Sequence, residues 1–266
     1  MAGSLHRQVA LVTGGGRGFG RGIAQRLAAE GACVSIAART PAEVDAVAAD
    51  ILAAGGRALA VVADVTLADD VARLVQATQD AFGDITLLVS NAGSPGPFGP
   101  VWEVDVDAWW AAQALHIRAP MLLAHAVLPG MVARRAGRVI IVSAVAARRV
   151  APHLSAYCVG KLAQTRIVEE IAAETRDLGV SAFAIDPGFV FTKLAAETLQ
   201  SPDAQRWLPT MVGRLRQRQK QEEEDPGADR DLGRCAQRCV DLASGRYDAL
   251  SGLYMELDDD LEGMLR

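Results

Sequence analysis

Short apolar runs alternate with longer amphipathic stretches along this chain. Hydrophobic residues recur at helical spacing after the glycine-rich segment 14–20 and over residues 41–54, 68–82, 107–133 and 155–178. Between these stretches lie near-continuous apolar runs of strand length, at residues 8–13, 33–38, 58–63, 86–90, 138–143 and 181–185. Such runs are typical of strands covered on both faces. Their alternation with helices predicts a parallel sheet with crossover helices.

The C-terminal part predicts three further elements. We expect a helix over residues 231–242, a seventh strand over 250–257 and a short helical tail over 261–266. The chain has 266 residues, of which 50% are hydrophobic and 22% charged, and it shows no internal repeat. It therefore predicts one α/β domain over residues 1–266.

Charge and cysteine content exclude several classes of protein. The formal net charge is −5 and the basic residues are scattered, which disfavours nucleic-acid binding. No apolar run reaches the roughly 20 residues needed to cross a bilayer, and the N-terminus lacks the layout of a secretory signal. The four cysteines fit a reduced protein better than a disulfide framework, and Cys235 and Cys239 stand at helical spacing that favours packing over metal binding. We expect a cytoplasmic protein with no metal and no membrane partner.

The glycine-rich segment at residues 14–20 follows a strand and precedes a helix. This context is the one that a dinucleotide-binding loop requires. Glycines allow a sharp turn and let a pyrophosphate approach backbone amides at the helix N-terminus. A tight corner without a ligand is the alternative interpretation.

Tyr157 and Lys161 stand four residues apart at the start of an amphipathic stretch. This spacing is one helical turn, so the phenol and the ammonium share a face. A phenol ordinarily keeps its proton until about pH 10, and a neighbouring cation lowers that pKa. The pair is suited to acid/base chemistry on a carbonyl or an alcohol. The alternative is a helical tyrosine and lysine with no joint role.

Together with three more motifs, these segments resemble the short-chain dehydrogenase/reductase family over nearly the whole chain. In order, the motifs are Thr13-Gly14-x-x-x-Gly18-x-Gly20, Asp64-Val65, Asn91-Ala92-Gly93, Tyr157-x-x-x-Lys161, and Pro187-Gly188 followed by Thr192. The resemblance implies a three-layer, doubly wound Rossmann-like fold. Its seven-stranded parallel sheet would have the order 3-2-1-4-5-6-7, and the protein would interconvert a ketone and a secondary alcohol by hydride transfer.

The resemblance also implies a nicotinamide cofactor and the residues that hold it. Asp64 would contact the adenine, the segment 91–93 would wall the cleft, the segment 187–192 would hold the nicotinamide amide, and Lys161 would bind the nicotinamide ribose. The expected cofactor-binding residues are Gly14, Arg17, Gly18, Phe19, Gly20, Arg39, Asp64, Val65, Asn91, Ala92, Gly93, Tyr157, Lys161, Pro187, Gly188, Val190 and Thr192.

Charge near the second strand favours NADP(H) over NAD(H). A carboxylate at the end of this strand would hydrogen-bond a ribose 2′-hydroxyl and repel a 2′-phosphate, whereas arginine accepts the phosphate. The region 37–40 contains Arg39 and no acid, and Arg17 lies inside the glycine-rich segment. A solvated loop charge is the alternative for Arg39.

Two positions depart from the family pattern. The family's catalytic serine usually stands thirteen residues before the tyrosine, where this chain has Ala144, and Ser143 is one position early. Because adjacent strand residues point to opposite faces, we expect Ala144 to face the nicotinamide. His116 replaces an asparagine and is either a satisfied buried histidine or a catalytic group. Pro120 cannot donate to the His116 carbonyl, so that carbonyl is expected to be free for a proton relay.

The missing serine leaves several functions open. The candidate catalytic residues are Tyr157, Lys161, Ser143 and His116. The substrate could polarise its own carbonyl, as a quinone would, or Ser143, His116 or His153 could replace the serine as donor. Alternatively the enzyme is a non-redox dehydratase, isomerase or cyclase. An inert cofactor-binding protein is disfavoured because the Tyr157 and Lys161 pair is intact.

Three variable segments would surround the substrate, at residues 94–102, 145–153 and 189–225. The third is expected to form an apolar lid, which indicates an apolar or aromatic carbonyl substrate. Arg148 and Arg149 could bind an acidic substrate or be solvated loop charges. The resemblance further implies a homodimer or homotetramer.

Overall fold

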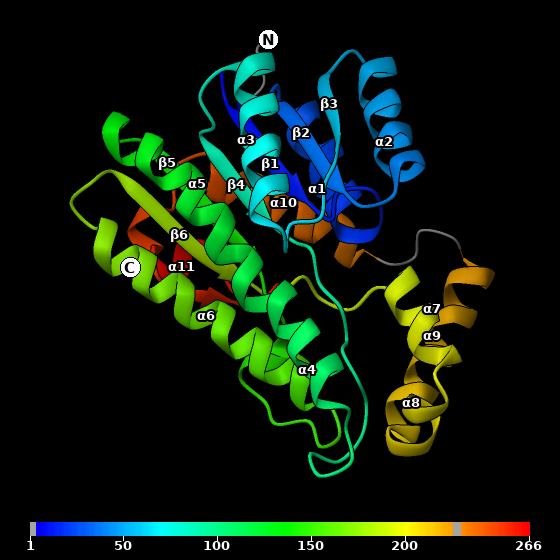
Figure 1. The fold of residues 1–266 in the computed structure, drawn as a ribbon. Coiled ribbons are helices and arrows are strands. Elements are labelled where there is room, and N and C mark those ends of the chain that lie inside the picture. The colour runs from blue at the N-terminus through cyan, green and yellow to red at the C-terminus, as the bar shows by residue number, and fades with distance from the viewer. Residues whose placement is uncertain (1–3, 226–229) are drawn as a thin grey trace.

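A single parallel sheet of seven strands forms the centre of the molecule. The computed structural model describes residues 4–225 and 230–266. The strands lie in the order β3-β2-β1-β4-β5-β6-β7, as expected (Figure 1). Their bounds are β1 Val9–Thr13, β2 Cys33–Ala38, β3 Arg57–Val62, β4 Leu87–Ser90, β5 Gly137–Val142, β6 Val180–Ile185 and β7 Tyr254–Met255.

Helices cover both faces of the sheet, because successive strand residues point to opposite faces. Ala10 and Val12 of β1 belong to one core cluster, and Val9 and Leu11 to another. The first cluster lies under α1 (Gly18–Ala29), α2 (Pro41–Ala53) and α10 (Asp231–Ala243), and it also buries Leu261 of α11 (Leu261–Met264). The second lies under α3 (Ala68–Phe82), α5 (Ala119–Arg134) and α6 (Ser155–Thr175). The result is the three-layer arrangement that the apolar strand runs predicted.

The long helix expected over residues 107–133 is interrupted. It consists of α4 (Val106–Gln113), a π turn η1 (Ala114–Arg118) and α5. Pro120 has no N–H for a normal helical bond to the residue four positions earlier, which favours a locally widened turn before it. The turn carries His116, so the irregularity falls beside the candidate site.

The seventh strand is shorter than residues 250–257. Asp248–Leu250 forms a 3-10 turn, η3, and only Tyr254–Met255 pairs with β6. Gly252 takes a positive φ of 92°, and at the other end the Glu256 amide turns back to Asp259 Oδ2 at 2.7 Å. These turns bound the strand on both sides.

The helical run Val106–Arg134 is long and apolar enough to cross a bilayer by length and composition. Its second half packs on the sheet instead. Leu123, Val127 and Met131 are buried in the second core cluster. This half of the run therefore contributes to the core that covers the sheet.

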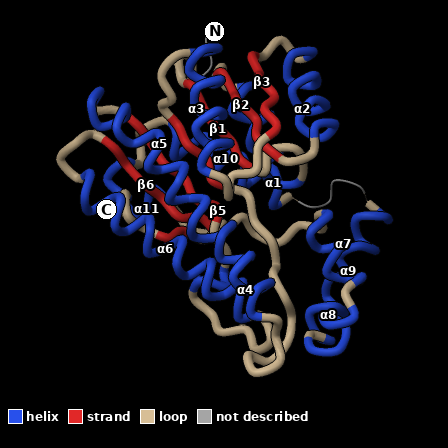
Figure 2. The backbone as a smooth tube through the Cα atoms, in the orientation of Figure 1, coloured by secondary structure: helices blue, strands red, loops and turns tan. Residues whose placement is uncertain are grey.

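Three helices follow β6 and stand apart from the two covering layers. They are α7 (Lys193–Gln200), α8 (Pro202–Trp207) and α9 (Pro209–Glu224) (Figures 1 and 2). Ala204 and Val212 pack with Phe98 and Leu154 in a third, small core cluster. The predicted lid region is thus a helical unit attached to the beginning of α6.

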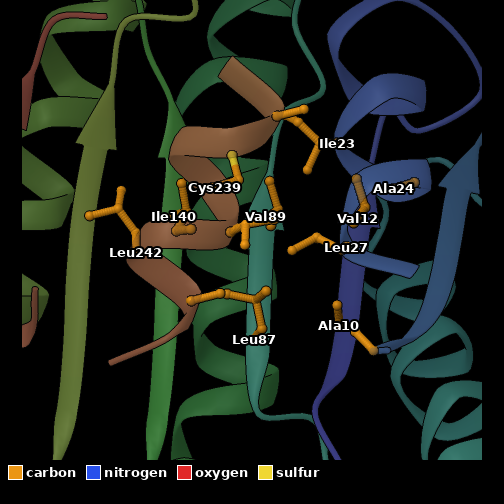
Figure 3. Packing of buried hydrophobic residues seen from close by; sticks show 14 of the residues in the cluster. Ala10, Val12, Ile23, Ala24, Leu27, Leu87, Val89, Ile140, Cys239 and Leu242 are labelled. Atoms are coloured by element: carbon orange, nitrogen blue, oxygen red, sulfur yellow. The ribbon is translucent and has the colours of Figure 1, made fainter. Parts of the chain in front are cut away.

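The first core cluster allows a test of the layer arrangement. Figure 3 shows side chains of α1 and α10 directed at the strands, among them Ile23, Leu27, Cys239 and Leu242. Leu27 is fully buried, so Leu27→Ala should lower the free energy of unfolding by about 2–5 kcal/mol. Leu52, which is 56% exposed on α2, provides the control, and Leu52→Ala should cost about 0.5 kcal/mol or less. Urea denaturation measures both, and equal losses would contradict this packing.

Candidate active site

A cleft of about 1430 Å³ opens where the strands end. In a parallel sheet the carboxyl ends of the strands meet at one edge, and ligands bind in the crevice outside it. Asn91 follows β4, Ser143 follows β5 and Asp186 follows β6, and all three line the cleft together with the glycine turn after β1.

The glycine turn has the geometry of a phosphate cradle. Gly14 has a φ of 61°, and a Cβ on Gly20 would lie 2.2 Å from the Gly14 carbonyl oxygen. The Asn91 side chain fixes this turn, because its Nδ2 donates to the carbonyl oxygens of Thr13 at 3.0 Å and Gly14 at 3.2 Å. The N-terminus of α1 opens beside the turn and has no acid in its first turn. These residues therefore fit the pyrophosphate of a dinucleotide.

The other expected cofactor residues lie around the same cleft. Gly20 is the exception, since it packs behind the turn. Asp64 accepts from the Thr66 amide at 3.0 Å and hydroxyl at 2.7 Å. The expected cofactor residues that line the cleft are Gly14, Arg17, Gly18, Phe19, Arg39, Asp64, Val65, Asn91, Ala92, Gly93, Tyr157, Lys161, Pro187, Gly188, Val190 and Thr192.

Lys161 is a buried cation at the base of the cleft. Its side chain points from α6 toward the end of β5, where Nζ donates to the Val142 carbonyl at 2.8 Å and to Gln164 Oε1 at 3.1 Å. The residue is 4% exposed. Burial lowers the pKa of Lys161 to about 7, although the charge of Asp186 opposes this shift. Lys161 is therefore able to exchange its proton near neutral pH.

The pKa of Tyr157 is shifted in the direction opposite to our expectation. Burial raises the pKa of the phenol well above its ordinary value, and the charges of Asp186 and Cys158 add to the effect. Lys161 Nζ lies 5.5 Å from the centroid of the Tyr157 ring, but its hydrogen bonds go to the Val142 carbonyl and to Gln164 Oε1. The prediction that Lys161 lowers this pKa is wrong for the arrangement seen here. Tyr157 holds its proton firmly.

Ser143 and Ala144 both line the cleft. The Ser143 amide continues the ladder to the Ile185 carbonyl at 2.8 Å, and its hydroxyl donates to the Lys161 carbonyl at 3.0 Å. No hydrogen bond joins Ser143 to Tyr157 within residues 4–225 and 230–266. The Ser143 hydroxyl is thus bound to backbone and would have to leave that partner to reach a substrate.

His116 is fully buried below the candidate acid. Nε2 donates to the Ser94 carbonyl at 2.7 Å, so Nδ1 is the acceptor toward Gln164 Nε2 at 3.5 Å. Burial, assisted by the charge of Lys161, lowers the pKa of His116 to about 3. The ring is neutral, with both nitrogens engaged, and it meets Tyr157 edge-on at 5.7 Å between centroids. It supports the site and has no spare donor for a substrate.

His153 lies on the substrate side of the cleft. It adopts a left-handed backbone with a φ of 66°, and its ring packs on Trp207 of α8 with 5.1 Å between centroids. Its Nδ1 is buried without a hydrogen-bond partner in the described part of the chain. Among the three alternative donors, His153 has the polar atom that is not already engaged.

Two cleft residues were missed by the sequence analysis. Asp186 accepts from the Val145 amide at 3.2 Å, and burial raises its pKa. Its position in the sequence, directly after an apolar strand and before Pro187, could have identified Asp186 as a cleft residue. Glu43 reaches the glycine turn from α2, where it contacts Arg17 at 3.3 Å. It lies beyond residues 37–40, the region at the end of the second strand where an acid that contacts the ribose is expected. No group of residues suited to a metal ion occurs in the described ranges.

The site combines a glycine turn, a cleft at the strand ends and a Tyr/Lys pair on one helix. These features are typical of an enzyme that uses a dinucleotide cofactor. Residues 8–203 match the family model described as short chain dehydrogenase. The chain therefore belongs to the short-chain dehydrogenase/reductase family.

Known relatives support this assignment over the full length. A short chain dehydrogenase of Pseudocercospora fijiensis is 32% identical over 99% of this chain and 84% of that protein. A metagenomic short-chain oxidoreductase, solved in complex with NADP, is 35% identical with a TM-score of 0.67, covering 70% of this chain and 85% of that one. Levodione reductase is 25% identical with a TM-score of 0.81, covering 96% and 97%.

The packing of His116 against α6 leads to a prediction. A Cβ on Gly160 would lie 2.6 Å from His116 Cβ, and the ring is held by hydrogen bonds on both sides. Gly160→Ala should therefore lower the free energy of unfolding by about 1–3 kcal/mol. The control is Gly213→Ala in α9, where nothing lies within 4 Å and the change should stabilise by up to about 1 kcal/mol. Thermal denaturation compares them, and a stabilised Gly160→Ala protein would refute the contact.

Proposed function

We propose that this protein is an NADP(H)-dependent oxidoreductase that interconverts a ketone and a secondary alcohol. The observation that carries the proposal is the position of Tyr157 and Lys161 in the same cleft as the glycine turn. When bound, the nicotinamide cofactor would supply or accept the hydride. Gly14, Arg17 and Asn91 would bind it from one side, and the segment 187–192 from the other.

The residues of the chain handle the proton. In reduction, the Tyr157 hydroxyl donates its proton to the substrate oxygen as negative charge develops there. The raised pKa of Tyr157 keeps this proton available at neutral pH. Lys161, whose Nζ lies 5.5 Å from the centroid of the Tyr157 ring and whose pKa is about 7, would then return a proton to the phenolate left behind.

The oxyanion donor is the unusual part of this site. Ala144 supplies no hydroxyl, and Ser143 is bound to the Lys161 carbonyl at 3.0 Å. We propose that the substrate carbonyl is either activated by its own structure or bound by His153. Losing one such donor lowers turnover by roughly 10²- to 10³-fold in other enzymes, so unactivated ketones should react slowly.

Ala144 also supports a second candidate function. A dehydratase, isomerase or cyclase would use Tyr157 and Lys161 for proton transfer alone, with the cofactor bound structurally or not at all. The firmly held proton on Tyr157 is compatible with this chemistry as well. An inert cofactor-binding protein is the least supported, because the complete Tyr/Lys pair would then have no role.

The substrate is proposed to be an apolar or aromatic carbonyl compound. Phe98, Leu154, Trp207, Leu208 and Met211 line the cleft on the side of α8 and α9. We propose that the helical unit 189–225 is the substrate lid, within a single domain. Arg149 and Arg214 lie on the same side and are exposed.

The preference for NADP(H) is supported by Arg17 and Arg39, which both line the cleft. The solved relative in complex with NADP gives weaker support, because it concerns another protein. A cytoplasmic location is proposed from the four free cysteines, which suit a reducing compartment. A homodimer or homotetramer is proposed from exposed apolar side chains on α4 and α6, including Trp110 at 61% and Leu162 at 57%.

The test is NADPH consumption with a panel of ketones and quinones. Wild-type protein should oxidise NADPH, with activated carbonyls turned over fastest. Tyr157→Phe should reduce kcat by about 10²-fold or more, because it removes the proton donor but keeps the ring. Ala144→Ser serves as the comparison, since it restores the hydroxyl that the family usually has.

The same assay separates the two candidate functions. Oxidation by the wild type that is lost in Tyr157→Phe would support the oxidoreductase. A wild type that binds NADPH without turnover, while Ala144→Ser gains activity, would contradict it and favour non-redox proton chemistry.

A further inference from the structure

Glu43 lies between two cations in the wall of the cleft. Its Oε1 is 3.3 Å from Arg17 Nη1 and 3.4 Å from Lys193 Nζ. Arg17 Nη2 also lies 3.8 Å from Glu197 Oε1. The four side chains come from the glycine turn, α2 and α7, and all of them line the cleft.

The helix itself holds Glu43 close to the glycine turn. A Cβ on Gly16 would lie 2.8 Å from Glu43 Cβ, so the first turn of α2 packs directly on the loop. The Glu43 side chain is 25% exposed and that of Arg17 is 43% exposed. Ion pairs at this exposure contribute little to stability. Backbone packing therefore fixes the Cβ of Glu43 beside the loop, and loss of the carboxylate charge should leave the fold intact.

This location is the one that distinguishes the two cofactors. In dinucleotide-binding folds, the group that reads the ribose 2′ position follows the second strand. Arg39 follows β2 directly, lines the cleft and makes no ion pair with another described residue. Glu43 lies four residues after Arg39, in the first turn of α2. A carboxylate here accepts a hydrogen bond from a hydroxyl and repels a phosphate.

The positive charge of the cluster is too small to balance a 2′-phosphate fully. Arg17, Arg39 and Lys193 provide three positive charges, and Glu43 and Glu197 provide two negative charges. One positive charge is left for a phosphate monoester that carries about −1.5 to −2 at pH 7. Without Glu43, two positive charges would remain, which matches the phosphate.

We propose that Glu43 is a specificity-determining residue that restrains the preference for NADP(H) over NAD(H). This inference rests on the proposed function and names the residue that sets its cofactor selectivity. Glu43 pairs with both Arg17 and Lys193, so the 2′-phosphate must compete with its carboxylate for these cations. A cofactor with a free 2′-hydroxyl meets no such competition.

The test is the binding of NADPH and NADH to full-length wild type and Glu43→Gln, measured by isothermal titration calorimetry. The ratio of the two dissociation constants should shift toward NADPH by about tenfold or more, the effect of one carboxylate at ion-pair distance. The control is Asp45→Asn, an equal charge change on the exposed face of α2 outside the cleft, which should leave the ratio unchanged. The Glu43→Gln shift should shrink at high salt.

Each other outcome overturns the inference. Equal changes in NADPH and NADH affinity would mean that Glu43 only supports the loop, and a shift toward NADH would reverse its role. Either result leaves the proposed function standing. Wild-type protein that binds neither dinucleotide would refute the proposed function, and this inference with it.

Discussion

The buried ammonium of Lys161 is the feature on which the candidate site depends. An unpaired charge inside a protein is strongly destabilising, so its surroundings must supply acceptors. The Val142 carbonyl and the Gln164 side chain do so, and the charge of Asp186 partly offsets the burial. Gln164 also contacts His116. The end of β5, the start of α6 and the π turn are thereby joined around one cation.

That arrangement determines where protons reside. His116 stays neutral because it is buried beside Lys161, and Tyr157 stays protonated because burial and Asp186 oppose a phenolate. Lys161 is the group in this set that titrates near neutral pH. The site therefore combines Tyr157, which stays protonated in the cleft, with Lys161, which exchanges its proton near neutral pH. Such a division is suited to delivering a proton to a substrate and then replacing it.

The strands were predicted much better than the details of the site. Apolar runs such as 8–13 and 181–185 identify buried strands because such strands are apolar along their whole length, and the family resemblance supplied the sheet order and the cleft. The engagement of His116 by the Ser94 carbonyl could not be predicted, since it depends on where a loop settles. Glu43 was missed for a related reason: its approach to Arg17 arises from helix packing rather than from spacing along the chain. The short length of β7 also could not be predicted, because it depends on turns made by neighbouring segments.

The most direct test of this account is the titration of Lys161 by NMR with lysine labelled with ¹³C at the ε carbon. The chain has three lysines, Lys161, Lys193 and Lys220, so Lys193→Arg and Lys220→Arg assign the signals. The account predicts that the Lys161 signal titrates with a pKa of about 7. A Lys161 signal that shows no titration below about pH 9 would contradict the buried, proton-exchanging lysine around which the site is described.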